Sequence, residues 1–250
     1  MFKGKVALVT GSAKGIGAAT IKLLASRNCN VIIHYNNSKD EAINLKKYID
    51  KNYNVKCEIV KFDLTNEDQI KTSTDYIIDK FGKIDILVNN ASLEITSDFN
   101  LKTKIDFKKI IDTNLIGTFL LSKEVSKYML KNKYGKIINV TSNNAINKYD
   151  PITLEYDASK AGIISLTHNF AVEFAPYINV NAVAPGWVMT ENVDNLNNSL
   201  DGILEIEESK NILMNRFAKP EEIAKLIVFL ASDDSSYINN EVIKIDGGTR

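Results

Sequence analysis

A short apolar strand followed at once by a glycine-rich turn is the feature that most constrains how this sequence folds. Lys5 to Thr10 (K-V-A-L-V-T) is a continuous apolar run of the kind shown by a strand buried on both faces. The turn Gly11-Ser12-Ala13-Lys14-Gly15-Ile16-Gly17 follows it directly, and we expect a helix over Ala18 to Arg27. A strand, a glycine turn and a helix in this order predict a parallel sheet covered by helices.

The turn has the features of a nucleotide-binding loop. Gly15 lets the backbone approach a pyrophosphate, and free N–H groups at the helix start would face the phosphates. The spacing differs from G-x-G-x-x-G, so a plain glycine-rich turn is the alternative interpretation. The candidate cofactor-binding residues of this turn are Gly11, Ser12, Lys14, Gly15, Ile16 and Gly17.

The rest of the chain repeats the alternation of strands and helices. Further strands are expected at Val31 to Tyr35, Lys56 to Phe62, Ile84 to Val88, Lys136 to Val140, Ile178 to Ala184 and Val242 to Ile245. With 250 residues, 44% of them hydrophobic, residues 1–250 fit one α/β domain better than two. The pattern predicts a doubly wound parallel sheet of about seven strands, with helices on both faces and the site at its carboxyl edge. The weakly periodic segment at about 188–216 is expected to be a mobile lid.

The charge balance excludes some classes of partner. Lysine and arginine together number 31, as do aspartate and glutamate, so no global field favours nucleic acid or an anionic membrane. Apolar runs such as Leu226 to Ala231 are too short to span a bilayer, and the N-terminal residues lack a signal-peptide profile. We therefore expect a cytoplasmic protein. Cys29 and Cys57 are expected to be buried thiols, and the two histidines lie too far apart in the sequence to indicate a metal site.

If the glycine turn binds a dinucleotide, the end of the second expected strand would meet its adenosine ribose. A carboxylate there would bond the ribose hydroxyls of NAD and repel a 2′-phosphate, but this chain has Tyr35, Asn36, Asn37 and Ser38. Lys14 adds a cation on the facing turn. These residues favour NADP(H) over NAD(H). The alternative is that Lys14 is merely solvated and that the site accepts either cofactor.

Other strand ends supply further candidates at the same edge. A carboxylate after the third strand could accept a hydrogen bond from the adenine amino group. Small and amide residues after the fourth strand suit the close approach of a flat ring, although they could equally stabilise the sheet edge. The candidate cofactor-binding residues at these strand ends are Asp63, Leu64, Asn90, Ala91, Pro185, Gly186, Val188 and Thr190.

Tyr156 and Lys160 have the spacing of neighbours on one helix face, with Ser142 upstream of them. A phenol titrates near pH 10, and a cation beside its oxygen lowers that pKa. A decrease of about three units corresponds to roughly 4 kcal/mol. The alternative is a chance pair on a helix surface. Asn114 lies within the apolar helical stretch Thr103 to Lys131, where its amide needs partners.

Taken together, these motifs resemble those of the short-chain dehydrogenase/reductase family over nearly the whole chain. The resemblance rests on Thr10-Gly11-x-x-x-Gly15-Ile16-Gly17, Asn89-Asn90-Ala91, Asn114, Ser142, Tyr156-x-x-x-Lys160 and Pro185-Gly186. It implies a Rossmann-type fold and hydride transfer to a carbonyl or from an alcohol. It also implies that Ser142 holds the carbonyl oxygen and Tyr156 transfers the proton. Lys160 would lower the pKa of the tyrosine and bond the nicotinamide ribose, and Asn114 would hold a water that links Lys160 to solvent.

The chain departs from the family pattern at three places. Ser142 and Tyr156 are 14 positions apart, one more than usual, so either the loop has an insertion or Thr141 takes the serine role. Ser92 replaces the usual glycine. Ala175-Pro176-Tyr177 stands where members that act on acyl carrier protein tend to have a basic residue.

The subfamily that the chain most resembles is the 3-oxoacyl-[acyl-carrier-protein] reductases. That resemblance implies an acyl-thioester substrate, with acyl carrier protein as a partner. Dehydrogenases of sugars, polyols or other small secondary alcohols share the motifs, and a non-catalytic NADP(H)-binding sensor is a further alternative. Family members are commonly homotetramers, which implies the same assembly here.

Overall fold

The computed structural model describes residues 2–250 and contains a seven-stranded sheet in the order β3-β2-β1-β4-β5-β6-β7. All neighbouring strands are parallel. The chain order reverses between β1 and β4, which places the crevice of a doubly wound sheet at the carboxyl ends of these strands. The strands are β1 (Val6–Val9), β2 (Asn30–Tyr35), β3 (Cys57–Lys61), β4 (Ile86–Asn89), β5 (Gly135–Val140), β6 (Ile178–Pro185) and β7 (Val242–Ile245).

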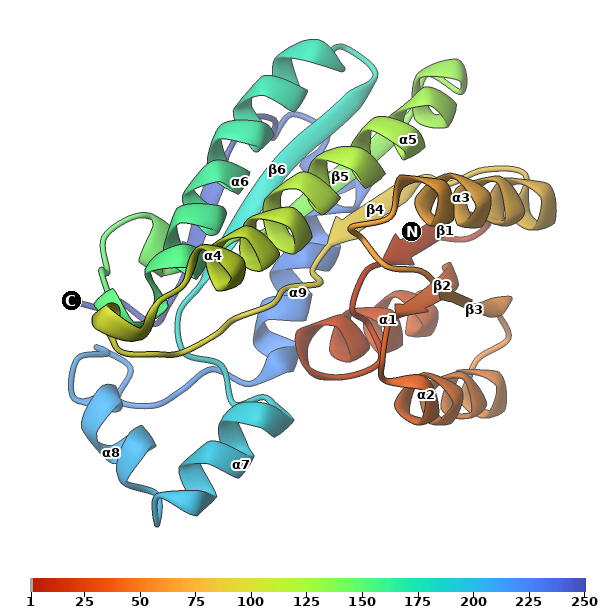
Figure 1. Cartoon of the computed structure of the whole chain (residues 1–250). Coiled ribbons are helices and arrows are strands. Elements are labelled where there is room, and N and C mark those ends of the chain that lie inside the picture. Colours follow the sequence, from red (N-terminus) through yellow and green to blue (C-terminus); the bar gives the residue numbers. More distant parts are fainter. Residues whose placement is uncertain (1) are drawn as a thin grey trace.

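Helices cover both faces of the sheet (Figure 1). Helices α1, α2 and α9 pack on one face, and α3, α5 and α6 pack on the other, each layer with its own apolar core. This arrangement confirms the predicted fold class. The α-helices are α1 (Gly15–Ser26), α2 (Lys39–Asn52), α3 (Glu67–Phe81), α4 (Lys104–Ile110), α5 (Gly117–Lys131), α6 (Leu154–Glu173), α7 (Glu191–Ser199), α8 (Ile203–Ser209) and α9 (Pro220–Leu230).

The long helical stretch predicted from residue 103 to residue 131 contains a π-helical turn. Helix α4 passes through η2 (Ile111–Ile116), a π-helix, into α5 without leaving helical backbone geometry. Asn114 lies within η2 and is fully buried. Such turns are frequent at functional sites because they reorient side chains and carbonyl groups.

The segment predicted to be a lid forms α7 and α8, which lie beyond the two helical layers (Figure 1). Asp201 and Gly202 between them adopt positive φ angles, so the chain reverses direction there. Several of the apolar side chains on these helices are exposed, including those of Leu196, Ile203 and Ile206. Whether the segment moves stays a prediction.

The remaining structural expectations concern membrane spans and cysteines. Among residues 2–250, no helix combines the length and apolar character needed to cross a bilayer. Cys29 and Cys57 are buried free thiols, as predicted.

Candidate active site

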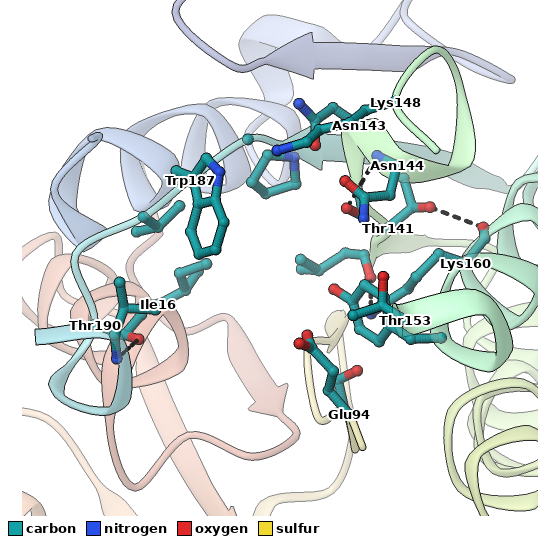
Figure 2. A pocket seen from close by; sticks show the side chains of 18 of the residues that line it. Ile16, Glu94, Thr141, Asn143, Asn144, Lys148, Thr153, Lys160, Trp187 and Thr190 are labelled. Carbon is teal, nitrogen blue, oxygen red and sulfur yellow. Dashed lines mark hydrogen bonds between the residues drawn. The ribbon is translucent and has the colours of Figure 1, made fainter. Parts of the chain in front are cut away.

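The carboxyl ends of β4, β5 and β6 surround a cavity of about 260 Å³. Figure 2 shows Ile16, Trp187 and Thr190 on one side of this cavity and Thr141, Thr153 and Lys160 on the other. The sheet therefore brings together residues that are distant in the sequence. The predicted site residues that line the cavity are Ile16, Asn90, Ser142, Tyr156, Lys160, Pro185, Gly186, Val188 and Thr190.

Ser142 and Tyr156 meet inside this cavity despite the longer loop between them. Ser142 lies two residues after the end of β5, and Tyr156 lies in the first turn of α6. A hydrogen bond from the Ser142 hydroxyl lowers the pKa of the Tyr156 phenol. The hydroxyl of Thr141 instead donates to the carbonyl oxygen of Lys160 at 2.8 Å. Of the two candidates, Ser142 is the one that faces the tyrosine.

The pKa of Tyr156 shifts in the direction opposite to the sequence-based expectation. Burial raises the pKa of Tyr156, the charge of Glu94 raises it further, and only the Ser142 hydroxyl opposes them. Burial also lowers the pKa of Lys160 to about 8, while Glu94 acts against that decrease. The Lys160 Nζ donates to the Val140 carbonyl oxygen at 2.9 Å. The expected acidification of Tyr156 by Lys160 is wrong for this arrangement, because desolvation dominates and the ammonium is directed to the β5 backbone.

Asn114 clamps the loop that follows β4. Its Oδ1 accepts a hydrogen bond from the Leu93 N–H at 2.7 Å, and its Nδ2 donates to the Leu93 carbonyl oxygen at 2.8 Å. The same Nδ2 donates to the Ser159 hydroxyl on α6 at 3.0 Å. The amide thus joins η2, the β4 loop and the helix of Tyr156. Asn114 lies behind the cavity lining rather than in it, and a water held by Asn114 stays a prediction.

The glycine turn is held by buried polar groups that the sequence did not single out. His34 Nδ1 accepts from the Gly11 N–H, and its Nε2 donates to the Phe62 carbonyl oxygen, each at 3.0 Å. Burial lowers the pKa of His34 to about 4, so the ring is neutral at pH 7. The predicted cofactor residue Ser12 is fully buried, and its hydroxyl accepts from the His34 N–H at 3.0 Å. The side chain of Ser12 therefore fixes the turn to β2 rather than facing a ligand.

Asn90 and Thr10 connect the glycine turn to the end of β4. The Asn90 side-chain amide donates to the carbonyl oxygens of Thr10 and Gly11. The Thr10 hydroxyl accepts from the N–H groups of Asn90 and Ala91, both at 2.9 Å. A Cβ on Gly11, whose φ is +59°, would lie 2.8 Å from the Ala91 Cα. Glycine is therefore required at position 11 for this close approach of two loops.

The start of α1 suits the pyrophosphate of a dinucleotide. Helix α1 begins at Gly15 after Lys14, no side chain caps it, and its first turn contains no acid. By contrast, the first turns of α2, α3, α6 and α9 each contain aspartate or glutamate. An uncapped helix start beside a lysine attracts anions, because the free N–H groups and the helix dipole both favour negative charge. The predicted residues Gly11, Lys14, Gly15, Ile16 and Gly17 all lie in this turn.

The far end of the predicted cofactor site is formed by the ends of β2 and β3. Tyr35 and Ser38 are half-buried, and Asn36 and Asn37 are exposed. The Asn36 amide donates to Asp63 Oδ2 at 3.2 Å. Hydrogen bonds to the Asp63 carboxylate, the strongest from the Thr65 N–H, lower the pKa of Asp63. The predicted residue Leu64 is buried and lies close beneath Gly117. This end of the site therefore has no carboxylate at β2 and an ionised one at β3.

Side chains outside the set of candidate catalytic and cofactor-binding residues also line the cavity or support its loops. Asp157 holds the loop before α6 by accepting from Asn144 Nδ2 at 3.0 Å, Thr153 Oγ1 at 3.2 Å and the Asp150 N–H at 3.3 Å. The signal that could have found part of this set is the inserted position between Ser142 and Tyr156, since a longer loop there enters the cavity. The additional lining residues are Ser92, Glu94, Val140, Thr141, Asn143, Asn144, Lys148, Asp150, Thr153, Trp187 and Val193.

Comparison with known proteins agrees with this geometry. A family model described as enoyl-(acyl carrier protein) reductase matches residues 11–250. The 3-oxoacyl-[acyl-carrier-protein] reductase FabG of Thermotoga maritima is 40% identical over 249 residues, which cover 99% of this chain and 98% of that protein. A 3-oxoacyl-[acyl-carrier-protein] reductase of Synechocystis sp. is 40% identical over 248 residues, covering 98% of this chain and 96% of that protein.

A solved structure extends the similarity to the fold. Levodione reductase superimposes with a TM-score of 0.92 at 31% identity, covering 99% of this chain and 98% of the other. The family match and the reductases among its relatives identify the chain as an oxidoreductase and imply a nicotinamide cofactor. The chain belongs to the short-chain dehydrogenase/reductase family.

Proposed function

We propose that this protein is an NADP(H)-dependent reductase of 3-oxoacyl thioesters carried by acyl carrier protein. The observation that carries the reaction type is the Ser142–Tyr156 hydroxyl pair inside the cavity. The substrate class is supported by relatives that are 3-oxoacyl-[acyl-carrier-protein] reductases by name and align with nearly the full chain. The pKa of Tyr156 is raised, which keeps the phenol protonated, the form needed to reduce a carbonyl.

The proposed roles of the side chains follow from where negative charge develops. When bound along the carboxyl edge, a nicotinamide cofactor would supply the hydride for carbonyl reduction or accept it in alcohol oxidation. The Ser142 hydroxyl donates to the carbonyl oxygen of the substrate and stabilises the charge that builds there. Tyr156 gives that oxygen its proton, which completes the alcohol. Lys160, whose Nζ lies 5.3 Å from the centroid of the Tyr156 ring, would bond the ribose of the bound nicotinamide cofactor.

The preference for NADP(H) is supported by the residues around the expected 2′-phosphate position. Tyr35 and the three residues after it, Asn36, Asn37 and Ser38, are uncharged, and Lys14 lies on the facing turn at the start of α1. The turn at residues 11–17, the ends of β2 and β3, and the residues from Pro185 to Thr190 would together hold the dinucleotide. Of the strand-end residues, Asp63 supports the adenine contact, because its carboxylate is ionised.

A second candidate function is the oxidation of a sugar, polyol or other small secondary alcohol. It is favoured by the polar lining of the cavity, in which Glu94, Asn144 and Asp150 provide hydrogen-bonding groups. A non-catalytic NADP(H) sensor is disfavoured because Ser142, Tyr156 and Lys160 are all present and meet at one cavity.

The test is a turnover assay that follows the absorbance of reduced nicotinamide. The purified protein is given NADPH or NADH together with 3-oxoacyl thioesters and simple ketones, and NADP with sugars and polyols. Faster oxidation of NADPH by 3-oxoacyl thioesters than by ketones supports the proposal. Turnover restricted to sugars or polyols supports the second candidate, and cofactor binding without turnover supports the sensor.

We further propose a cytoplasmic homotetramer of single-domain subunits in which α7 and α8 form the lid. Support for assembly comes from exposed apolar side chains on α4, η2, α5 and α6, namely Phe107, Ile116, Phe119 and Val172. Light scattering tests the assembly, because a mass of one 27.9 kDa chain would refute it.

A further inference from the structure

Glu94 is a charged side chain in the substrate cavity to which the mechanism above assigns no role. It lines the cavity together with Ser142 and Tyr156, and Figure 2 shows it entering from the loop after β4. We propose that Glu94 determines substrate specificity. Its carboxylate accepts a hydrogen bond from an N–H or O–H group of a neutral carbonyl substrate and excludes substrates with a carboxylate near the carbonyl. This inference rests on the proposed function and specifies its substrate class.

The backbone beside Glu94 is held in place on both sides. Asn114 bonds both the N–H and the carbonyl oxygen of Leu93, the preceding residue, at 2.7 and 2.8 Å. On the other side, the Ser97 N–H donates to the Ile152 carbonyl oxygen at 3.2 Å. These bonds fix the loop against the elements that present Tyr156. Glu94 is therefore placed at the cavity by the structure around it, not by chance on a free loop.

The Glu94 carboxylate, which lines the same cavity as Ser142, Tyr156 and Lys160, also acts on the reacting groups electrostatically. Its charge raises the pKa of both Tyr156 and Lys160, on the first and second turns of α6. Partial desolvation raises the pKa of Glu94 itself, although the residue is exposed to solvent. A carboxylate that acts on Tyr156 also acts on a bound substrate, because the substrate oxygen must contact Ser142 and Tyr156.

The nearby cations do not neutralise this acid through an ion pair. Lys148 is paired with Glu208 on α8, and Lys160 Nζ is buried against the Val140 carbonyl oxygen. Asp150 adds a second carboxylate to the same cavity. Among residues 2–250, no salt bridge joins Glu94 or Asp150 to a cation. Glu94 Oε1 accepts a long hydrogen bond from the Thr96 hydroxyl, at 3.5 Å.

The arrangement selects between two chemical forms of the same 3-oxo group. A thioester is neutral. The arm that links an acyl group to a carrier protein contains amide N–H groups, which can donate hydrogen bonds to a carboxylate. A free 3-oxo acid is anionic, and bringing it beside Glu94 costs like-charge repulsion in a partly desolvated site. The cavity therefore admits the neutral thioester and rejects the free acid.

The test compares two substrates that differ in charge. Wild type, Glu94→Gln and Glu94→Asp are assayed with NADPH on the N-acetylcysteamine thioester of acetoacetate and on acetoacetate itself. Asp98→Asn is the matched control, since Asp98 is an exposed acid of the same loop and does not line the cavity. In Glu94→Gln we expect kcat/KM for acetoacetate to rise about tenfold relative to the thioester. Glu94→Asp and Asp98→Asn should keep the wild-type ratio.

The outcomes separate this inference from the proposed function. If all proteins reduce the thioester but the ratio in Glu94→Gln stays within twofold of wild type, the specificity role is overturned and the proposed function stands. If wild type binds NADPH and reduces neither substrate, the proposed function fails and the inference fails with it. Should Glu94→Gln not fold, Glu94→Thr removes the same negative charge, and an unchanged ratio in that variant overturns the role.

Discussion

The indole N–H of Trp187 donates to Glu208 Oε2 at 3.0 Å, and this bond fastens α8 to the segment that follows β6. Lys148 Nζ donates to the same carboxylate oxygen at 3.0 Å. Trp187 also stacks on Phe217, with ring centroids 5.1 Å apart and planes 8° apart. Because Trp187 and Lys148 both line the cavity, Glu208 connects the predicted lid to the wall of the site.

Replacing Glu208 by glutamine should loosen the lid without unfolding the protein. Glutamine retains an acceptor for the indole but loses the ion pair with Lys148. For a partly exposed pair this removes up to about 1 kcal/mol, or about fivefold in KM for the carbonyl substrate. Trp187 is the only tryptophan, so its fluorescence reports the change directly. We expect a red-shifted emission in Glu208→Gln.

The control for this variant is the neighbouring residue on the same helix. Glu207 pairs with Lys210 and is exposed to solvent, so Glu207→Gln should leave both the emission and KM as in wild type. If the two glutamine variants behave alike, Glu208 does not fasten the lid.

Tyr156→Phe should abolish reduction while leaving the cofactor bound. The substitution removes only the hydroxyl that contacts Ser142, and loss of a general acid lowers kcat by roughly 10²- to 10⁴-fold. NADPH binding, measured by nucleotide fluorescence, should remain within a few-fold of wild type. Tyr149→Phe is the matched control, because Tyr149 lies in the same loop region and is 82% exposed. Undiminished turnover by Tyr156→Phe would exclude the proposed mechanism.

Asn114→Ala should destabilise the protein and reduce activity together. The change leaves the N–H and the carbonyl oxygen of Leu93 without their partners, at a cost of about 1–3 kcal/mol for each buried group. Urea unfolding should therefore show a loss of about 3 kcal/mol. Asn198→Ala, in an exposed residue of α7, should change stability by less than about 0.5 kcal/mol. A stable but inactive Asn114→Ala would indicate that the asparagine acts in chemistry alone.

The sequence predicted the features that depend on residues close together in the chain, and it missed those that depend on contacts between distant residues. Strand periodicity, the glycine turn and the Tyr156–Lys160 spacing are local, and the fold follows from them. The sequence analysis expected Lys160 to lower the pKa of Tyr156, whereas the structure raises it. This increase could not be predicted, because it arises from burial and from Glu94, which is distant in the sequence. The role of His34 was missed for the same reason: its ring bonds a turn and a strand end that meet only in the folded sheet.

Charge changes where the glycine turn faces the end of β2 should alter cofactor preference. Lys14→Ala should lower kcat/KM with NADPH about five- to tenfold more than with NADH, because both cofactors carry the pyrophosphate but only NADPH carries the 2′-phosphate. Tyr35→Asp places a carboxylate at the end of β2 and should shift the preference toward NADH. Lys22→Ala, farther along α1, is the control. Equal losses with both cofactors in Lys14→Ala would contradict the NADP(H) assignment.

The buried ring of His34 should make stability depend on pH. Its pKa is lowered by burial from 6.5 to about 4, so between these pH values the unfolded chain binds a proton that the native protein does not. The contribution of this group is therefore fully present above pH 6.5 and is lost as the pH falls toward 4, by about 3 kcal/mol in total.

His34→Gln tests this assignment, because glutamine can still accept from the Gly11 N–H but does not titrate. The variant should be less stable than wild type at pH 7, and the two unfolding free energies should converge as the pH falls from 6.5 to 4. His168→Gln, in an exposed residue, retains His34 and should follow the wild-type curve. Chemical denaturation at several pH values measures the difference, in which the titration of carboxylates common to all three proteins cancels. Parallel curves for wild type and His34→Gln would show that His34 is not the buried neutral group holding the glycine turn.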